Sequence, residues 1–435
     1  MNRNAENRYL NLIQLILSSP RKQEIDILNA HREFIDSDFI SYLMSSGEEL
    51  RKKGELQPAE RLIDLADKLL KIQTSNVSTY KREEYFRFLL AVLQKVSEGI
   101  QPQLIYNFLR KNQDKIDSNL INLLEYWATE TLLSVGAQQQ QAIANDLVNF
   151  ANLISEFNSG NKIKNLELAI VAYQAALKIY EPTTFPKNWA IINTNLANAW
   201  RDRGISGATE RDKSIETAIG LYELALEVIT QEKYAYAWGN LQRNLGIAYL
   251  YRQTENYGEN LEVAIACYKK ALSVHNFDDF PQEWAASNNN LGDVFLKRLW
   301  GDKENNIEMA ISYLEAALRV YTLQNFPHNW AMIQNNLGNA FQSRIKGDKS
   351  DNIERAIFYY QNALSIHTLE DYPYNWAMLN NNLAGAYRYR LQGDKNKNKQ
   401  QAIAFLKRSL IVFTQDKFPQ QWADIQQNIS NLVNK

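Results

Sequence analysis

Six asparagines at regular intervals are the residues of this sequence best suited to bind another molecule. Each follows a tryptophan by six residues: Asn195, Asn244, Asn290, Asn336, Asn382 and Asn428. An amide side chain offers a donor and an acceptor together, so it can hold the C=O and N–H groups of a peptide backbone without reading the side chains of the peptide. The same chemistry allows each asparagine to tie its helix to a neighbouring repeat. The sequence leaves both roles open.

The side chains expected beside these asparagines are mostly uncharged. They are Arg243, Asn289, Asp293, Asn335, Asn339, Asn381, Arg388 and Tyr389. A site for acidic C-terminal peptides would need Lys and Arg repeated at these positions. Because basic residues are sparse there, we expect the partner to be a protein or an extended peptide of little net charge.

No convergent set of catalytic side chains is apparent in the sequence. The four histidines do not have the spacing of metal ligands, and His275 and His367 stand at matching positions of a repeat. Cys267 takes the place of an apolar or aromatic residue of the other repeats, so we expect a buried thiol and not a nucleophile. The sequence therefore predicts a protein that is not an enzyme and needs no metal or cofactor.

The composition favours a soluble protein with a large core. The chain has 435 residues, of which 45% are hydrophobic, and a formal net charge of -1. This charge gives no reason to expect nucleic acid or an anionic membrane as a partner. The single cysteine excludes an internal disulfide framework and fits a reducing compartment. We therefore expect a cytoplasmic protein.

The asparagines belong to a repeat of about 46 residues. The tryptophans before them are separated by 49 residues once and then by 46 residues four times: Trp189, Trp238, Trp284, Trp330, Trp376 and Trp422. A second series keeps the same steps: Ala169, Ala218, Ala264, Ala310, Ala356 and Ala402. A fixed period of this length is typical of stacked units, each of which buries its apolar face against the next.

Each repeat contains two segments with helical periodicity. In the first, Leu291 and Phe295 fall on one stripe with Trp284, and in the second, residues 307–321 carry another apolar stripe. The asparagines would lie in the middle of the first helix, roughly 120° from the tryptophan stripe. Asparagine is a mediocre helix former, so its repetition there indicates a purpose beyond helix propensity.

Short motifs mark where these helices begin and end. A Phe-Pro or Tyr-Pro pair, such as Phe280-Pro281, starts the first helix, because proline suits the first helical position. The turns GDK at Gly301, Gly347 and Gly393 end it. We expect the second helix to be capped by the residue before its first apolar position, which is Ser214, Asn260, Asn306 or Asn352.

A series of arginines stands near the end of each first helix: Arg203, Arg252, Arg298, Arg344 and Arg390. A cation is favourable at the negative end of a helix, and we expect these side chains to reach Asp302 or Asp348 of the following turn. Both the arginines and the tryptophans are therefore predicted to be structural.

The first 135 residues lack the 46-residue step but remain helical in pattern. The predicted helices cover residues 5–18, 36–54, 57–72, 82–99, 101–112 and 117–134. We therefore expect an all-α protein with an all-helical N-terminal domain at 1–135 and a solenoid at 136–435. The solenoid would start with a degenerate unit around Asn149-Phe150-Ala151 and finish with a terminal capping helix.

The repeat resembles the tetratricopeptide repeat. Leu291-Gly292-x2-Phe295, followed by Ala310-x3-Leu314-x2-Ala317, is similar to its L-G-x2-Y and A-x3-F pattern. Two features depart from it, because the unit has 46 residues instead of 34 and the tryptophan stands one turn earlier. The sequence pattern FP-x2-WA-x3-NNLG is similar to the long repeats of cyanobacterial tetratricopeptide proteins, many of which end in a caspase-like CHAT protease domain.

This resemblance implies an α-solenoid of stacked helical hairpins that forms a superhelix. Its concave groove would be lined by the first helices, and some proteins of the family hold peptides there through a ladder of asparagines. The resemblance thus implies a non-catalytic scaffold that binds a protein or peptide. The alternative is a sensor or regulatory subunit of a caspase-like (CHAT) protease system, with the protease on a separate chain.

Overall fold

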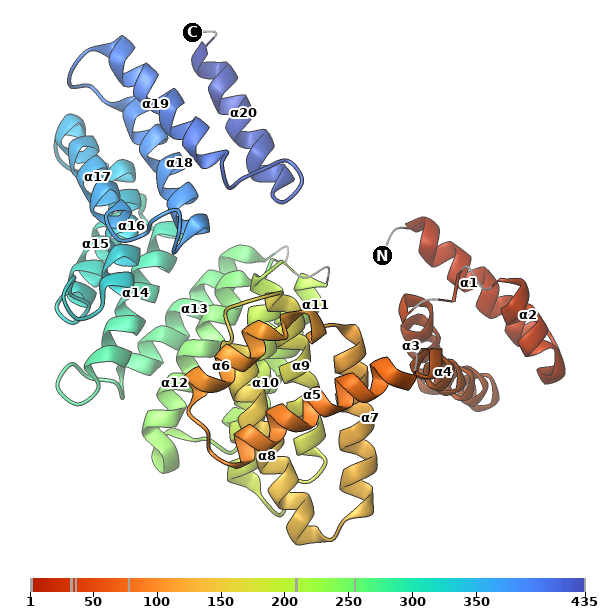
Figure 1. The fold of residues 1–435 in the computed structure, drawn as a ribbon. Coiled ribbons are helices and arrows are strands. Elements are labelled where there is room, and N and C mark those ends of the chain that lie inside the picture. Colours follow the sequence, from red (N-terminus) through yellow and green to blue (C-terminus); the bar gives the residue numbers. More distant parts are fainter. Residues whose placement is uncertain are drawn as a thin grey trace. The chain divides into compact units, whose positions relative to one another are not determined.

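The computed structural model of the protein describes residues 3–31, 34–35, 37–76, 79–207, 210–253 and 256–433. Every regular element in these ranges is a helix (Figure 1). The chain divides into two compact units, residues 1–185 with 202–211 and residues 186–201 with 212–435. The prediction of an all-α solenoid is confirmed. The predicted boundary near residue 136 concerned the start of the repeat pattern and stays a prediction.

The first unit begins with helices that lack the 46-residue repeat. Its helices up to residue 134 are α1 (Arg3–Ser18), α2 (Glu24–Ala30), α3 (Ser37–Lys52), α4 (Leu56–Asn76), α5 (Thr79–Ser97), α6 (Pro102–Lys111) and α7 (Ser118–Ser134). All except α2 match predicted segments; residue 36, the first of the second segment, lies outside the described residues. Phe39, Leu43 and Leu62 are fully buried in a core that α1, α3 and α4 share.

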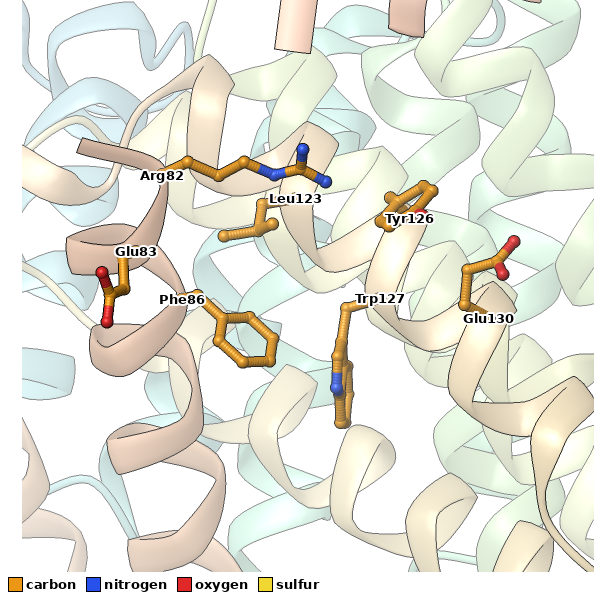
Figure 2. A pocket seen from close by; sticks show the side chains of 7 residues that line it. All are labelled: Arg82, Glu83, Phe86, Leu123, Tyr126, Trp127 and Glu130. Atoms are coloured by element: carbon orange, nitrogen blue, oxygen red, sulfur yellow. The ribbon is translucent and has the colours of Figure 1, made fainter. Parts of the chain in front are cut away.

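Helices α5 and α7 border a pocket in the first unit (Figure 2). Its volume is about 500 Å³, and its walls are mainly apolar. Phe86 comes from α5, whereas Leu123, Tyr126 and Trp127 come from α7. No motif of the sequence pointed to this pocket.

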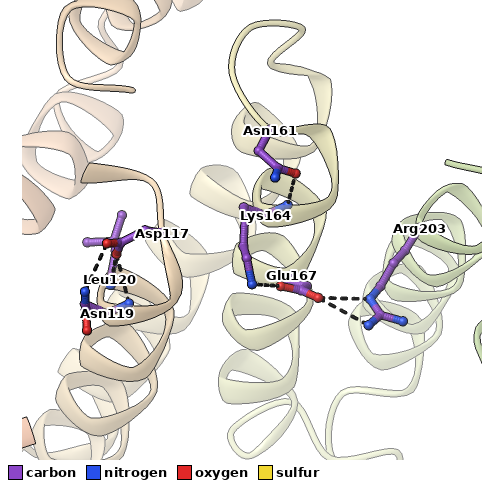
Figure 3. Close-up of polar contacts among 7 residues, drawn as sticks. All are labelled: Asp117, Asn119, Leu120, Asn161, Lys164, Glu167 and Arg203. Carbon is purple, nitrogen blue, oxygen red and sulfur yellow. Dashed lines mark hydrogen bonds and ion pairs between the residues drawn. The ribbon is translucent and has the colours of Figure 1, made fainter. Parts of the chain in front are cut away.

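The last hairpin of the first unit consists of α8 (Ala137–Glu156) and α9 (Lys162–Leu177), which pack against each other. Phe150 and Ala151 are buried, as are the Leu-Gly pairs that they resemble in sequence. Figure 3 shows Arg203 beside Glu167 of α9, with Nη2 and Oε1 3.2 Å apart. It also shows Asp117, which accepts hydrogen bonds from two backbone N–H groups at the start of α7.

The second unit is a stack of helical hairpins. Its helices are α10 (Pro186–Ile205, of which 186–201 belong here), α11 (Arg211–Leu226), α12 (Gln231–Tyr251), α13 (Tyr257–Leu272), α14 (Pro281–Lys297), α15 (Lys303–Leu318), α16 (Pro327–Ser343), α17 (Lys349–Leu364), α18 (Pro373–Tyr389), α19 (Lys395–Ser409) and α20 (Pro419–Val433). From α12 onward each helix packs against the next, and the first helices α12, α14, α16 and α18 also touch in succession. Each repeat thus contributes one hairpin to a shared core.

The predicted apolar stripes form this core. Leu291 of α14 and Leu314 of α15 are fully buried, and Leu337 of α16 is buried in the next layer. The tryptophans, such as Trp330, pack against the edge of the core and keep part of their surface exposed. Burial of apolar area on both sides of every hairpin makes each unit depend on its neighbours.

The helix boundaries follow the predicted motifs. Proline is the first residue of α14, α16 and α18, and Gly301, Gly347 and Gly393 adopt positive φ in the turns after these helices. The only first helix of this series with an internal break is α12, where Ala235 takes the place of proline and Tyr234 is non-helical. Proline therefore sharpens the start of the helix, as its fixed φ requires.

The predicted caps of the second helices are wrong by one turn. Helices α15 and α17 begin after Asp302 and Asp348, whose carboxylates accept the N–H groups of Asn305 and Asp351 at 2.8 and 2.9 Å. The residues expected as caps lie inside the helices. Asn306 and Asn352 instead donate from Nδ2 to the backbone carbonyls of Trp300 and Lys346, which fixes the preceding turn.

Candidate functional site

The six predicted asparagines occupy the same position on successive first helices of the second unit. They lie on α10, α12, α14, α16, α18 and α20, and all six side chains are partly exposed. The leucine that follows each of the middle four is buried. The asparagines are therefore neither sealed between helices nor fully in solvent. We refer to them as the asparagine row.

Members of the asparagine row bond to amides of the preceding repeat. Nδ2 of Asn382 donates to Oδ1 of Asn335 at 2.9 Å and lies 3.3 Å from Oδ1 of Asn339. Asn336 donates in the same way to Asn289 at 3.3 Å. These bonds tie successive first helices together, which is the structural role that the sequence left open. They use the amide donors of Asn336 and Asn382; Oδ1 of Asn336 in turn accepts from Nδ2 of Asn335 at 3.5 Å.

The same tie joins the first two helices of the series. Nδ2 of Asn244 donates to Oδ1 of Asn198 at 3.1 Å. Oδ1 of Asn244 and Oδ1 of Asn382 accept no hydrogen bond within the part of the chain that the structure describes. Both acceptors are thus available on a partly exposed surface.

Asn290 lacks this tie for a reason visible in the sequence. The preceding repeat carries Arg243 and Ile247 where other repeats carry amides, and neither side chain has an acceptor. Asn290 makes no hydrogen bond among the described residues. Its whole amide is therefore open to a partner.

Arg243 is a cationic residue beside the asparagine row. Its Nη2 donates to Oδ1 of Asn240 at 3.2 Å, while its buried Nε has no hydrogen-bond partner. Burial lowers the pKa of the Arg243 guanidinium. No carboxylate of the described chain lies within ion-pair distance of it. An unpaired guanidinium of this kind favours an acceptor group on a ligand.

A cavity of about 180 Å³ lies at the end of the asparagine row. Its lining includes four predicted residues, Asn381, Asn382, Arg388 and Asn428, together with Tyr389. Polar and apolar atoms contribute equally to its walls. Gly385, which also lines the cavity, stands where the preceding repeat has Asn339. The structure therefore brings this part of the predicted site together around one cavity.

Tyrosine hydroxyls of the second helices form hydrogen bonds with amides of the first helices. These tyrosines were not predicted from the sequence. The Tyr360 hydroxyl lies 2.8 Å from Oδ1 of Asn339 and 2.9 Å from Oε1 of Gln342. The Tyr222 hydroxyl donates to Oδ1 of Asn198 at 2.6 Å. A signal was present in the sequence, because a tyrosine within an apolar stripe needs a partner for its hydroxyl when it is buried.

The arginine series binds other partners than predicted. Arg298 pairs with Glu262 at 2.6 Å, and Arg344 pairs with Glu308 at 2.7 Å, both in the second helix of the preceding repeat. The expected partners Asp302 and Asp348 cap the following helices instead. The structural role of the arginines is thus observed, but the assigned carboxylates were wrong.

Cys267 and three of the histidines make packing contacts or hydrogen bonds within the fold. Cys267 is buried, which confirms the predicted buried thiol, and burial raises the pKa of this thiol to about 11. His275 contacts the backbone carbonyl of Tyr236 at 3.0 Å, and Nε2 of His367 lies 3.0 Å from Nδ1 of His328. Within the described ranges, no group of three or more His, Cys, Asp or Glu side chains is placed to hold a metal ion.

None of the helices that the structure describes is long and apolar enough to cross a membrane. No protein-family model matches the chain, and no curated protein matches it significantly. The likeness to tetratricopeptide repeats therefore remains an expectation from the sequence.

Proposed function

We propose that the protein is a non-catalytic scaffold that binds an extended segment of another protein along the asparagine row. The observation that carries this proposal is the set of hydrogen bonds made by the Asn382 side chain and its position beside a cavity. Its donor is held by Asn335 and Asn339, its acceptor is open, and its side chain lines a cavity. A fixed amide with a free acceptor suits the N–H of a peptide backbone.

The spacing of the row fits an extended ligand. Packed helices lie roughly 8 to 10 Å apart, and a strand rises about 3.3 Å per residue. Each asparagine would therefore meet about every third residue of a peptide. Bonds to the backbone favour many sequences equally, so the selectivity must come from a few other points.

Two features supply such points. The cavity beside Asn382 and Asn428 has room for a small side chain, with Arg388 at its wall. Arg243 offers a guanidinium without a carboxylate partner in the described chain. The preferred ligand is an extended, nearly neutral segment with one acceptor group that reaches Arg243.

The test is capture of the partner from the native organism by the full chain. A variant with Asn290, Asn336 and Asn382 all changed to Ala should lose the partner. Each lost tie costs about 1 kcal/mol, and the better helix propensity of alanine offsets part of it, so helicity and melting should change little. Mass spectrometry of the same capture would identify a separate caspase-like protease, the partner that the family resemblance implies.

A matched control replaces three exposed asparagines elsewhere in the second unit, Asn305, Asn325 and Asn396, by Ala. This variant should capture the partner as well as the wild type does. Retention of the partner by the variant in the asparagine row would overturn the proposal. Loss of folding in that variant alone would assign the row a purely structural role.

A further inference from the structure

The pocket between α5 and α7 is lined by aromatic rings from two helices. Phe86 and Trp127 are partly buried, and Tyr126 is 50% exposed. In Figure 2 their rings, with Leu123 between the two helices, surround an open space. A volume of about 500 Å³ falls in the range of small-molecule sites.

One ring of the pocket already holds a cation. The guanidinium carbon of Arg82 lies 5.6 Å from the centre of the Tyr126 ring, and Figure 2 shows the side chain extending from α5 toward α7. The face of an aromatic ring is electronegative, so it attracts a positive charge. Arg82 is exposed and forms no ion pair with any residue that the structure describes. Little therefore holds it in this position.

Carboxylates stand at both ends of the pocket, but only one of them is available. Glu83 is paired with Arg87 at 2.6 Å. Glu130, one helical turn after Tyr126, has no ion-pair partner among the described side chains. The apolar walls disfavour a hydrated metal ion, and the free carboxylate disfavours an anion.

We propose that this pocket binds a small molecule that carries an alkylated ammonium group. The alkyl substituents would contact Phe86, Leu123 and Trp127, while the positive charge would face Tyr126 and Glu130. Arg82 stands in for this cation when the pocket is empty and leaves when the ligand enters. This inference uses only the first unit and is independent of the function proposed for the second.

The test compares two probes of the same shape on the full chain by isothermal titration calorimetry. Choline carries the charge, and 3,3-dimethylbutan-1-ol is its neutral isostere. Choline should bind about ten-fold more tightly, because cation–π attraction and the carboxylate act only on the charged probe. Equal affinity for both probes, or tighter binding of the alcohol, would overturn the proposal.

Variants assign the effect to this pocket. Arg82→Gln should strengthen choline binding several-fold, because it removes a competing cation, and Glu130→Gln should weaken it several-fold. Tyr126→Phe keeps the ring and should retain binding, whereas Tyr126→Leu should lose the preference for choline. Leu133→Ala, on the same helix but not in the pocket lining, is the control.

Circular dichroism establishes that each variant is folded before its affinity is compared. Because Arg82, Glu130 and Tyr126 are exposed, their replacement should leave melting unchanged. Weaker choline binding in the folded Arg82→Gln variant contradicts the proposal. An affinity for choline that is the same in the wild type and in every pocket variant also contradicts the proposal.

Discussion

Arg344 donates two parallel hydrogen bonds to Glu308, from Nε to Oε1 at 2.7 Å and from Nη2 to Oε2 at 2.9 Å. The same pair, always 36 residues apart, recurs as Arg203–Glu167, Arg252–Glu216, Arg298–Glu262 and Arg390–Glu354. The Arg344 guanidinium also lies 5.3 Å from the ring centre of Phe341. Each first helix is thereby fastened to the second helix of the preceding repeat.

Breaking this pair should destabilise the second unit measurably. The side chains of Arg344 and Glu308 are 20% and 30% exposed, so the bidentate pair should contribute about 1 kcal/mol, at the upper end for partly exposed pairs. A double-mutant cycle with Arg344→Gln and Glu308→Gln in urea denaturation measures this coupling. The exposed pair Arg87–Glu83 is the control and should give a coupling near zero. Equal couplings in both pairs would contradict the expectation.

A second prediction concerns the glycine of the Leu-Gly pair. A Cβ added to Gly338 would lie 2.4 Å from Cε1 of Tyr360, so the first helix approaches the second closely at this point. Gly338→Ala should therefore cost about 1 to 3 kcal/mol in thermal or urea denaturation, as overpacking does.

The repeat itself offers the compensating change. In the next repeat Ala384 stands at the glycine position, and Leu406 stands at the position of Tyr360. The double variant Gly338→Ala with Tyr360→Leu should regain part of the lost stability. If the stability losses of Gly338→Ala and Tyr360→Leu simply add in the double variant, close approach to the tyrosine ring is not the reason for glycine at this position.

The order of helices was readable from the sequence because its signals are local. Phe-Pro and GDK fix the ends of the first helices through backbone geometry within a few residues, so they held in the structure. The cap of α15 was misplaced because Asp302 and Asn306 are both good capping residues one turn apart. Lys303 and Glu304, which follow Asp302, favour a helix, so α15 begins after Asp302 and not after Asn306.

Contacts between repeats were beyond the sequence. Arg344 had an acid four residues ahead, Asp348, and another 36 residues behind, and only the stacking of hairpins selects Glu308. The asparagine row was found from its period, but its bonds to Asn289, Asn335 and Asn339 depend on the register between first helices. The aromatic pocket left no signal, because its residues follow no repeat.

A third prediction compares the same hydroxyl in two repeats. Tyr268 and Tyr360 are equivalent, but the Tyr268 hydroxyl is buried without a hydrogen-bond partner in the described chain, because Ile247 and Leu250 replace the amides that Tyr360 contacts. Tyr268→Phe should therefore be neutral or stabilise by about 1 kcal/mol, whereas Tyr360→Phe should destabilise by about 1 kcal/mol. Denaturation midpoints of the two variants decide this. Equal losses would contradict it.

A fourth prediction concerns acid stability. Burial, and then the charge of His328, lowers the pKa of His367 to about 4, whereas an unfolded histidine titrates near 6.5. Between these values the native state binds fewer protons than the unfolded state. Stability that is present above pH 6.5 is therefore lost as the pH falls toward 4.

Phenylalanine stands at the position of His367 in the next repeat, as Phe413. His367→Phe should remove on the order of 2 kcal/mol of the acid-induced loss. Urea midpoints at pH 7 and pH 4.5 measure it. The difference between the urea midpoints of the wild type and the variant should shrink at pH 4.5 or change sign. An identical loss in both proteins would mean that the pKa of His367 is the same in the folded and the unfolded state.

The arginine–glutamate pairs and the amide ties between repeats of the second unit join residues that are only 36 to 47 positions apart. No such bond has to wait until remote parts of the chain have met, so the entropy of closing long loops opposes folding very little. We therefore expect that any hairpin can act as the folding nucleus and that order then spreads to the hairpin on either side. A kinetic barrier that belongs to one particular repeat is therefore not required for this array to assemble.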